Sequence, residues 1–439
     1  MTDRQRSVLM IAYYFPPMGL SGVQRTLKFA KFLPKYGWKP TVFTVEPTGY
    51  YAMDPTLLAE AQEAGIEIIR TRSLDPNRLF ATTRISKMPS EPLRKLLQFF
   101  SDFFFVPDSK IGWKRQAVSV ASELLRTRSF DVLFATSPPQ TDLLIGLALK
   151  RRSQLPLVIE YRDSWLNYPF KMFPTPVHRW LHGRLERRVI RGCDKVIVTH
   201  RRVKEELLRR YPFQDHHDVV ILSQGFDQSD FDRAHSQKRA TGESLRITHA
   251  GTFYAGRNPG VLLTALANIY RDSPQLRGRF QIRFVGTVRG SDEQLVSKLG
   301  LGNDVAFTGY LPHRECVREL KEADLLWFVI DNDTQSPGKL YEYFGARKPI
   351  LASAVEGYTS QLLRESKAAT ILPLSDVAAH EKALRDMLSM FERKKLPKVS
   401  DDFAAQFERI ALTGELAKHL ELYMDVERYA VAPKEVPER

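Results

Sequence analysis

Short apolar runs alternate with helical patterns along the chain, in two series separated by a polar stretch. Strands that alternate with helices usually form parallel sheets, so this pattern predicts two α/β domains. The first series of predicted strands comprises Val8–Phe15, Pro40–Val45, Gly65–Ile69, Val132–Ala135, Pro156–Glu160 and Lys195–Thr199. The second comprises Arg246–Ala250, Gln281–Val285, Val305–Phe307, Ala323–Ile330, Pro349–Ala352 and Ala369–Leu372.

The same pattern gives the expected domain boundaries. We expect an amino-terminal domain over 1–226, a polar linker over 227–244, a second domain over 245–402 and a terminal segment over 403–439. Helical spacing from Phe403 to Val426 predicts a helix that packs back on the amino-terminal domain, followed by a frayed tail over Ala430–Arg439. Ligands of parallel sheets bind at the carboxyl ends of the strands, so two facing domains would form one deep cleft.

The composition supplies enough hydrophobic residues for two domain cores, and the small number of cysteines indicates a reducing compartment. The chain has 439 residues, 43% of them hydrophobic, and its two cysteines, Cys193 and Cys316, are too few for a disulfide framework. The apolar run Val8–Phe15 is too short for a signal peptide core and meets prolines, and no apolar window approaches the ~20 residues that span a bilayer. We expect a cytoplasmic protein, either free or peripheral on the inner face of the cytoplasmic membrane.

A net charge of +14 indicates an anionic partner. The basic residues gather in the region Arg179–Arg210, which is either a solvated face or an anionic membrane surface contact. Aromatic residues are sparse there, so we expect no nucleic acid. The aromatic run Phe99–Pro107 is interpreted either as core, the interpretation that we favour, or as a second contact with a bilayer.

The segment Ser336–Leu351 is the most informative candidate for a ligand-binding site. Pro337 and Gly338 break the chain before a short helix, whose free N–H groups and Lys339 suit a pyrophosphate. Glu342 follows in the first turns, where its carboxylate can accept two hydrogen bonds from a ribose diol. We interpret the segment as a clamp for a nucleoside diphosphate; the alternative is an ordinary loop-helix-strand unit.

Two further loops place small residues at strand ends. The first, with Gly19, Ser21 and Gly22, opens a helix after the first strand, and the second, with Gly251 and Thr252, begins the second domain. Small residues let the backbone approach a ligand closely, although the first loop is equally compatible with a purely structural turn. The first loop is neither a dinucleotide fingerprint nor a P-loop. Arg257 follows the second loop and can reach a phosphate, or is a surface arginine.

Ionisable residues also follow the fifth strand and the strand Ala323–Ile330. Arg162 and Asp163 are predicted to reach the cleft, or to form a structural ion pair. Asp331 and Asp333 could hold a divalent ion, but two acids in a polar loop are common without one, and the histidines lack zinc spacing. We therefore expect no metal site.

In order and spacing, these pieces resemble glycosyltransferase family 4 of the GT-B fold, and more closely its branch with a long, variable amino-terminal domain. The matching motifs are Phe15–Gly19 with Ser21–Arg25, Val106–Asp108 with Trp113, Thr136–Pro139, Tyr161–Trp165, Gly251–Tyr254, Phe307–Tyr310 and Lys339–Pro349. The resemblance implies two Rossmann-like domains that face a cleft. It also implies sugar transfer from a nucleoside diphosphate sugar with retention, with no cofactor and no required metal.

The resemblance implies roles for particular residues. Glu342 matches the ribose-binding glutamate that ends the family's Glu-x7-Glu motif, whereas Thr334 replaces the first glutamate. Thr252 stands where the family has a phosphate-binding arginine, so Arg257 and Lys339 are assigned to phosphate stabilisation, and Asp163 matches a strand-end His/Asp position. The expected catalytic residues are Asp163, Arg257 and Lys339. The expected donor-binding residues are Gly22, Gly251, Thr252, Arg257, Ser336, Gly338, Lys339, Leu340 and Glu342. On the acceptor side we expect Gly19, Ser21, Arg162 and Asp163.

The expected partners are a nucleotide-sugar donor and a saccharide or lipid-linked acceptor, in polysaccharide, lipopolysaccharide or glycolipid biosynthesis. Two rival functions share the fold. One is a sugar-nucleotide epimerase, whose acid and base Asp163 and Glu160 would imitate. The other is a degenerate scaffold that binds nucleotide or membrane, which the missing first glutamate suggests.

Overall fold

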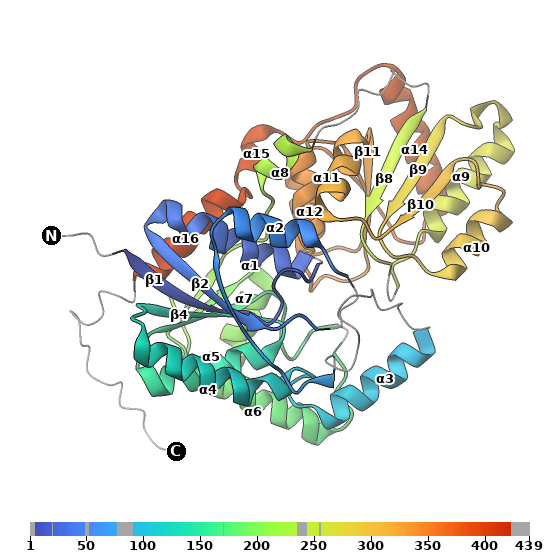
Figure 1. Ribbon diagram of the computed structural model, residues 1–439. Helices are drawn as coiled ribbons and strands as arrows, with labels where there is room; N and C mark the ends of the chain where they lie inside the picture. Colours follow the sequence, from blue (N-terminus) through green and yellow to red (C-terminus); the bar gives the residue numbers. More distant parts are fainter. Residues whose placement is uncertain are drawn as a thin grey trace.

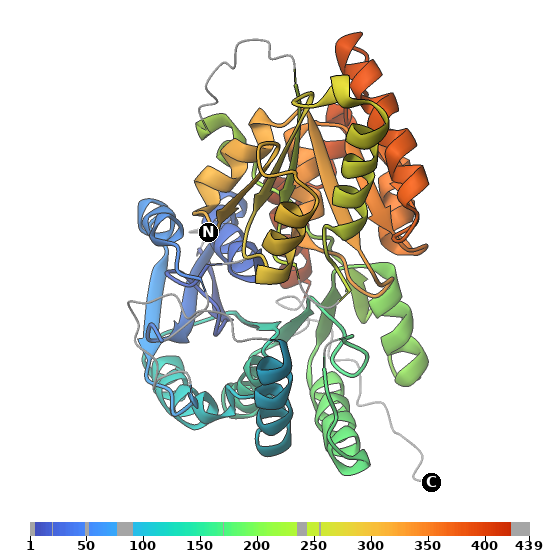
Figure 2. The same ribbon diagram turned by 90° about the vertical axis from the view of Figure 1, so that its right-hand side faces the viewer.

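The structure is a computed structural model that describes residues 5–19, 21–48, 52–76, 91–169, 171–234, 244–253 and 256–422, with the side chains of 21 and 91–95 outside the description. Each of its two domains is built on one parallel sheet (Figure 1). Figure 2 shows the carboxy-terminal domain above the amino-terminal one. The fold is therefore the predicted pair of Rossmann-like α/β domains.

The amino-terminal sheet has the strand order β3-β2-β1-β4-β5-β6-β7. Its strands are β1 (Arg6–Ile11), β2 (Trp38–Val45), β3 (Glu67–Thr71), β4 (Val132–Ser137), β5 (Leu157–Tyr161), β6 (Lys195–Val198) and β7 (Val219–Ile221). Its helices are α1 (Ser21–Phe32), α2 (Pro55–Glu63), α3 (Glu91–Phe104), α4 (Ile111–Thr127), α5 (Gln140–Ser153), α6 (Pro176–Gly192) and α7 (Arg201–Arg210). The strands have continuous apolar runs because helices cover both faces of the sheet. Only β7, a three-residue edge strand, was not predicted.

The carboxy-terminal sheet has the order β10-β9-β8-β11-β12-β13. Its strands are β8 (Leu245–Ala250), β9 (Phe280–Val285), β10 (Val305–Gly309), β11 (Leu325–Ile330), β12 (Ile350–Ala354) and β13 (Ala369–Leu372). The helices of this domain are α8 (Gln228–Arg233), α9 (Gly260–Asp272), α10 (Gly290–Lys298), α11 (His313–Glu322), α12 (Gly338–Ala346), α13 (Tyr358–Glu365), α14 (Val377–Glu392) and α15 (Asp401–Ala405), and the last helix, α16 (Arg409–Glu421), returns to the amino-terminal domain. Two separate apolar cores fill this domain.

The chain crosses between the domains at two neighbouring points. The N–H of Phe226 donates to the carbonyl of Phe407 (3.0 Å), and the N–H of Arg409 donates to the carbonyl of Phe226 (2.7 Å). The expected single helix from Phe403 is therefore divided into α15 and α16 at this crossing. Leu412, Leu416 and Leu420 of α16 then pack into the core of the amino-terminal domain. The predicted frayed tail, 430–439, lies outside the described residues.

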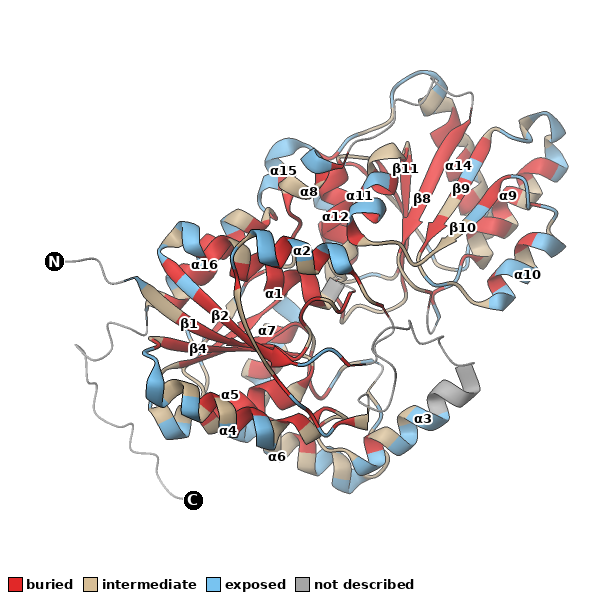
Figure 3. Cartoon of the chain, in the orientation of Figure 1, coloured by how far each residue is buried: buried red, intermediate tan, exposed pale blue. Residues whose placement is uncertain are grey.

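Two sequence-based expectations differ from the structure. The first part of the polar linker forms α8, because Asp227 caps the helix through the N–H of Ser229 and pairs with lysines of α1. The favoured core interpretation of the aromatic run is wrong for Phe99, Phe100, Phe103 and Phe104. All four are exposed, up to 70% at Phe104, and Figure 3 shows pale blue residues along α3.

Candidate active site

A cavity of about 860 Å³ lies between the domains, at the carboxyl ends of the central strands. Residues of both domains line it. The amino-terminal domain contributes Tyr14, Gly22, Gln24, Asp54, Pro138, Arg162, Asp163, Tyr168 and Gln224. The carboxy-terminal domain contributes the segments 249–253, 285–291 and 335–339 together with Arg257, Tyr310, Leu311, His313, Cys316, Phe328 and Val329.

The beginning of α12 faces this cavity. Pro337 is the N-cap residue, and Gly338 and Lys339 follow it on the cavity wall. Because the first N–H groups of a helix have no partner within the helix, this end favours an anion. Ser336 also lines the cavity, and its hydroxyl lies 2.7 Å from that of Tyr341. Leu340, in contrast, is 1% exposed and packs in the domain core, so its side chain anchors the helix instead of facing a ligand.

Lys339 and Glu342 form an ion pair one turn apart on α12. Lys339 Nζ lies 2.7 Å from Glu342 Oε2, and His313 Nε2 lies 3.4 Å from Glu342 Oε1. Burial acts to raise the pKa of the Glu342 carboxyl, but Lys339 and His313 lower it to about 2. Burial likewise acts against the charge of Lys339, yet Cys316 and Glu342 raise its pKa above the ordinary value. Glu342 is thus held as a buried carboxylate behind the cavity wall.

Arg257 is the second cation on this side of the cavity. Its Nε donates to Asp331 Oδ1 (2.9 Å), and its Nη2 donates to Gln335. Asp333 of the same loop pairs with Arg202 (2.6 Å) of α7. The two acids that resembled a metal site are therefore each bound to a guanidinium. Thr334, which replaces the first glutamate of the motif, bonds to Asn332 within this loop.

The opposite wall is built on the end of β5. Asp163 is half-buried there; burial raises the pKa of its carboxyl, while Arg162 and Arg257 lower it from the two sides of the cleft. Arg162 is buried and donates to the carbonyls of Ser137 (3.1 Å), Pro138 and Gly22. The guanidinium of Arg162 therefore holds the surrounding loops through their carbonyls and not through an ion pair with Asp163, which lines the cavity.

The remaining predicted residues separate into two groups. Gly22, Gly251 and Thr252 line the cavity. Gly19 instead touches the other domain, because a Cβ at this position would lie 2.2 Å from the Tyr310 hydroxyl. The side chain of Ser21 lies outside the described residues.

Arg162→Lys is expected to lower the free energy of unfolding by about 1–3 kcal/mol, because an ammonium group is too compact to serve three carbonyls and leaves buried acceptors unsatisfied. Urea unfolding measures the change. Arg187→Lys, at an exposed position of α6, is the matched control and should stay within about 0.5 kcal/mol of the parent protein. Equal effects of the two substitutions would contradict the role assigned to Arg162.

Sequence reasoning missed a third wall of the cavity, the loop after β9. Gly286 has φ 135°, and a Cβ there would lie 2.2 Å from the Gly251 carbonyl oxygen, so this loop and the Gly251 loop pack backbone to backbone. The signal was present, because Val285-Gly286 repeats the strand-then-glycine pattern of Ala250-Gly251. The histidines were set aside because they lack zinc spacing, but the ring of His313 reaches the carboxylates of Asp230 (3.7 Å) and Glu342 (3.4 Å).

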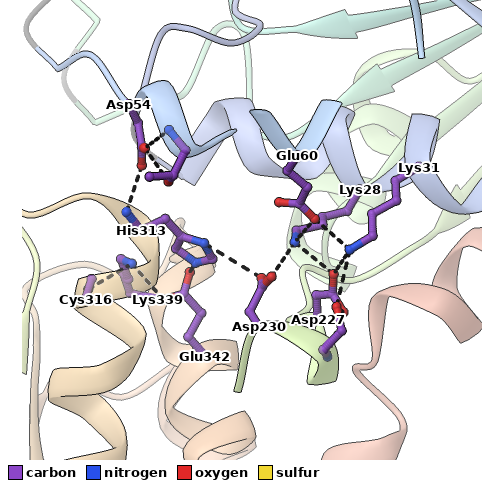
Figure 4. A network of polar contacts seen from close by, with 12 residues as sticks. Lys28, Lys31, Asp54, Glu60, Asp227, Asp230, His313, Cys316, Lys339 and Glu342 are labelled. Carbon is purple, nitrogen blue, oxygen red and sulfur yellow. Dashed lines mark hydrogen bonds and ion pairs between the residues drawn. The ribbon is translucent and has the colours of Figure 1, made fainter. Parts of the chain in front are cut away.

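A buried polar network connects the site to α8, which follows the first crossing between the domains (Figure 4). Lys28 of α1 pairs with Glu60 (2.6 Å) of α2 and with Asp227 (2.8 Å) and Asp230 (2.7 Å) at α8. Asp230 faces His313, which in turn faces Glu342. Among the described residues, Glu60, Asp227 and Asp230 have spacing suited to a metal ion, but the ammonium groups of Lys28 and Lys31 already occupy that position.

Two family models match the chain. The model for Glycosyltransferase Family 4 matches residues 21–230, and the model for Glycosyl transferases group 1 matches residues 244–390. Both models describe glycosyltransferases, one over the amino-terminal domain and the other over the carboxy-terminal domain. The chain is 25% identical over 215 residues to the D-inositol 3-phosphate glycosyltransferase of Streptomyces scabiei, across 46% of this chain and 47% of the relative. The chain spans about half the length of the curated relatives it matches.

Solved structures share the whole architecture. A glycosyltransferase from Rickettsia africae superposes with a TM-score of 0.64 at 14% identity, over 97% of this chain and 100% of the other. HepE of Anabaena, solved with UDP and glucose, gives a TM-score of 0.61 at 15% identity, over 95% and 100%. This likeness, together with the two parallel sheets, confirms the predicted GT-B fold.

Proposed function

We propose that this protein transfers a sugar from a nucleoside diphosphate sugar to an acceptor hydroxyl, with retention at the anomeric carbon. The observation that carries the proposal is the convergence of Lys339, Arg257 and the N-terminus of α12 on one interdomain cavity. Such an arrangement suits a diphosphate. The acceptor is a saccharide or a lipid-linked sugar, and the reaction belongs to polysaccharide, lipopolysaccharide or glycolipid biosynthesis.

On the donor side, the chemistry is electrostatic. The leaving diphosphate gains negative charge as the anomeric bond breaks, and fixed cations and N–H groups stabilise that charge in the transition state. Lys339 and Arg257 supply the cations, so no metal ion is required and turnover should persist in EDTA. Glu342 holds Lys339 through Oε2, while Oε1, whose neighbour His313 lies at 3.4 Å, is assigned to the ribose diol.

On the acceptor side, the hydroxyl attacks the same face of the sugar from which the diphosphate departs. A phosphate oxygen takes the proton of the hydroxyl, so the step needs no protein nucleophile. Asp163 faces the cavity from the other domain and accepts a hydrogen bond from the acceptor. Arg162 keeps the end of β5 in place through the carbonyls that it binds.

Calorimetric binding of UDP, GDP, ADP and CMP tests the donor site. UDP comes first because HepE, which shares the fold, was solved with it. We expect selective binding of one nucleotide, weakened at least tenfold in Glu342→Gln, which is about 1.4 kcal/mol. Glu365→Gln, at an exposed position of the same domain, is the matched control. Failure of the folded protein to bind any of the four would refute the donor site.

Incubation with a sugar donor of the preferred base then separates the proposal from its rivals. A transferase releases the nucleoside diphosphate and attaches the sugar to the acceptor with the anomeric configuration of the donor. An epimerase leaves the nucleotide sugar whole but inverted at one sugar carbon, and a scaffold binds without turnover. Either of the last two results would overturn the proposal while leaving the nucleotide site intact.

A further inference from the structure

Helix α3 is attached to the protein by its polar side and presents its apolar side to solvent. Six large apolar residues of the helix are exposed, with exposed fractions from 38% to 70%: Leu96 (52%), Leu97 (53%), Phe99 (38%), Phe100 (50%), Phe103 (42%) and Phe104 (70%). At about 100° per residue they share an arc of about 160°. Asp102, on the opposite side, is buried and accepts a hydrogen bond from Lys171 (2.7 Å). Surface helices usually have the reverse orientation.

The apolar side of α3 continues onto the beginning of α6. His178 Nε2 donates to the carbonyl of Phe103 (3.0 Å), and the two rings lie 5.1 Å apart, so the helices meet at this point. Met172, Val177 and Trp180 are exposed beside it, by 37%, 61% and 58%. We call these three residues and the six of α3 the apolar patch. Single exposed apolar residues are ordinary, but a contiguous group of this size marks an interaction surface.

Arginines continue the same face of α6 beyond the apolar patch. At about 100° per residue, Val177 and Trp180 share an arc of about 100° with the four exposed arginines of the basic stripe. The basic stripe comprises Arg184, Arg187, Arg188 and Arg191. Arg184 lies over the Trp180 ring (5.3 Å), and Glu186, the one acidic residue of α6, is buried and bound to Arg210. No carboxylate of α6 neutralises the basic stripe, so its positive charge can attract an anion from outside the protein.

We infer that the apolar patch and the basic stripe together form a docking surface for an anionic lipid bilayer. Aromatic side chains are stable at the level of the lipid headgroups, and arginines beside them bind lipid phosphates. A second copy of this chain fits less well, because it carries the same positive stripe and a net charge of +14. This inference goes beyond sugar transfer and does not rest on it.

The docking surface belongs to the amino-terminal domain. Figure 1 places α4 and α6 along the bottom of this domain, away from the carboxy-terminal domain, and α3 at its right-hand edge, with the carboxy-terminal domain above it. The bilayer contact that we infer is therefore made by the amino-terminal domain. Among the described residues, no helix is long and apolar enough to cross a membrane, so the contact that we infer is peripheral.

Co-sedimentation with lipid vesicles tests the surface. We expect binding at least tenfold tighter to vesicles of phosphatidylcholine and phosphatidylglycerol at 7:3 than to phosphatidylcholine alone. Phe103→Ser/Phe104→Ser should weaken that binding at least tenfold, and Arg184→Glu/Arg188→Glu should reduce it to the level of neutral vesicles. The matched controls are Met390→Ser and Lys382→Glu/Lys395→Glu, at exposed positions of the other domain, and they should bind as the parent does.

Tryptophan fluorescence gives a second readout. Of the five tryptophans, Trp38, Trp113, Trp165 and Trp327 are fully buried, so a blue shift on adding vesicles reports Trp180 and should disappear in Trp180→Phe. Equal vesicle binding by parent and patch variants would overturn the inference, as would no binding by the parent. A parent dimer that becomes a monomer in Phe103→Ser/Phe104→Ser would assign the patch to a second copy instead. Nucleotide affinity should be unchanged in all variants, because the apolar patch and the basic stripe lie outside the donor site.

Discussion

Lys339→Met is expected to lower the turnover of the donor sugar by a factor of about 10²–10³. Lys339 lies at the N-terminus of α12 on the cavity wall, where the leaving diphosphate gains charge under the proposed mechanism. Removing one preorganised group that stabilises such charge typically costs this much in kcat. Steady-state release of the nucleoside diphosphate measures the effect, and calorimetry with the nucleotide alone shows how much of it is lost ground-state binding.

The same substitution removes the ion-pair partner of the buried Glu342, so its structural effect has to be separated from its catalytic one. Lys339→Met/Glu342→Gln removes both charges and should restore most of the thermal stability while turnover stays low. Lys382→Met, at an exposed position, is the matched control and should leave both properties unchanged. Turnover within threefold of the parent in the folded single variant would contradict the assignment of Lys339.

Lys28→Met is expected to lower the free energy of unfolding by about 3–5 kcal/mol, because it leaves the buried carboxylates of Glu60, Asp227 and Asp230 without their shared partner. Lys28 is 2% exposed, whereas Lys31 also pairs with Glu60 and Asp227 but is more exposed. Lys31→Met is therefore the matched control and should have a smaller effect. Chemical denaturation of both variants gives the comparison.

The pH dependence of stability provides an independent check on this network. Burial acts to raise the pKa of Glu60 and Asp227, but Lys28 lowers both below their ordinary values. Their contribution is therefore present above the pKa of the unfolded chain, near 4, and is lost as the pH falls below it. Burial raises the pKa of Asp230, so this third carboxyl does not share the dependence.

We expect the melting temperature of the parent protein to fall steeply between about pH 5 and pH 3, and that of Lys28→Met to fall less. Lys28→Met/Asp230→Asn should recover part of the lost stability at neutral pH, because one uncompensated carboxylate has been removed. If the melting temperatures of the parent protein and of Lys28→Met fell by the same amount across this pH range, the network would contribute no pH-dependent stability.

Much of the fold was predictable because its signals are local. Twelve of the strands appear near the predicted positions, since a strand covered on both faces has to be a continuous apolar run. The beginning of α12 was also predictable, because Pro337 and Gly338 break the chain before an apolar-periodic segment. The edge strand β7 was missed because three residues give no measurable pattern.

The side chains of the site depended on partners far away in the sequence. Glu342 was expected to bind a ribose diol, and only the fold shows that its buried carboxylate also lies 3.4 Å from His313, which comes from another helix. Arg162 was expected to touch the acceptor, but carbonyls from three other positions use its guanidinium. Asp227 was assigned to a polar linker, and only the fold shows that it pairs with Lys28 and Lys31 at the start of α8.

The sequence by itself determined the order of strands and helices, the two-domain architecture and the strand-end loops that line the interdomain cavity. It could do so because backbone geometry and the burial of alternating elements depend on neighbouring residues. The tertiary structure alone decided which charges neutralise one another, which face of α3 meets solvent and which side chains reach the cavity. These outcomes depend on distances between residues that are remote in sequence, such as Lys28 and Asp230, and no local pattern encodes them.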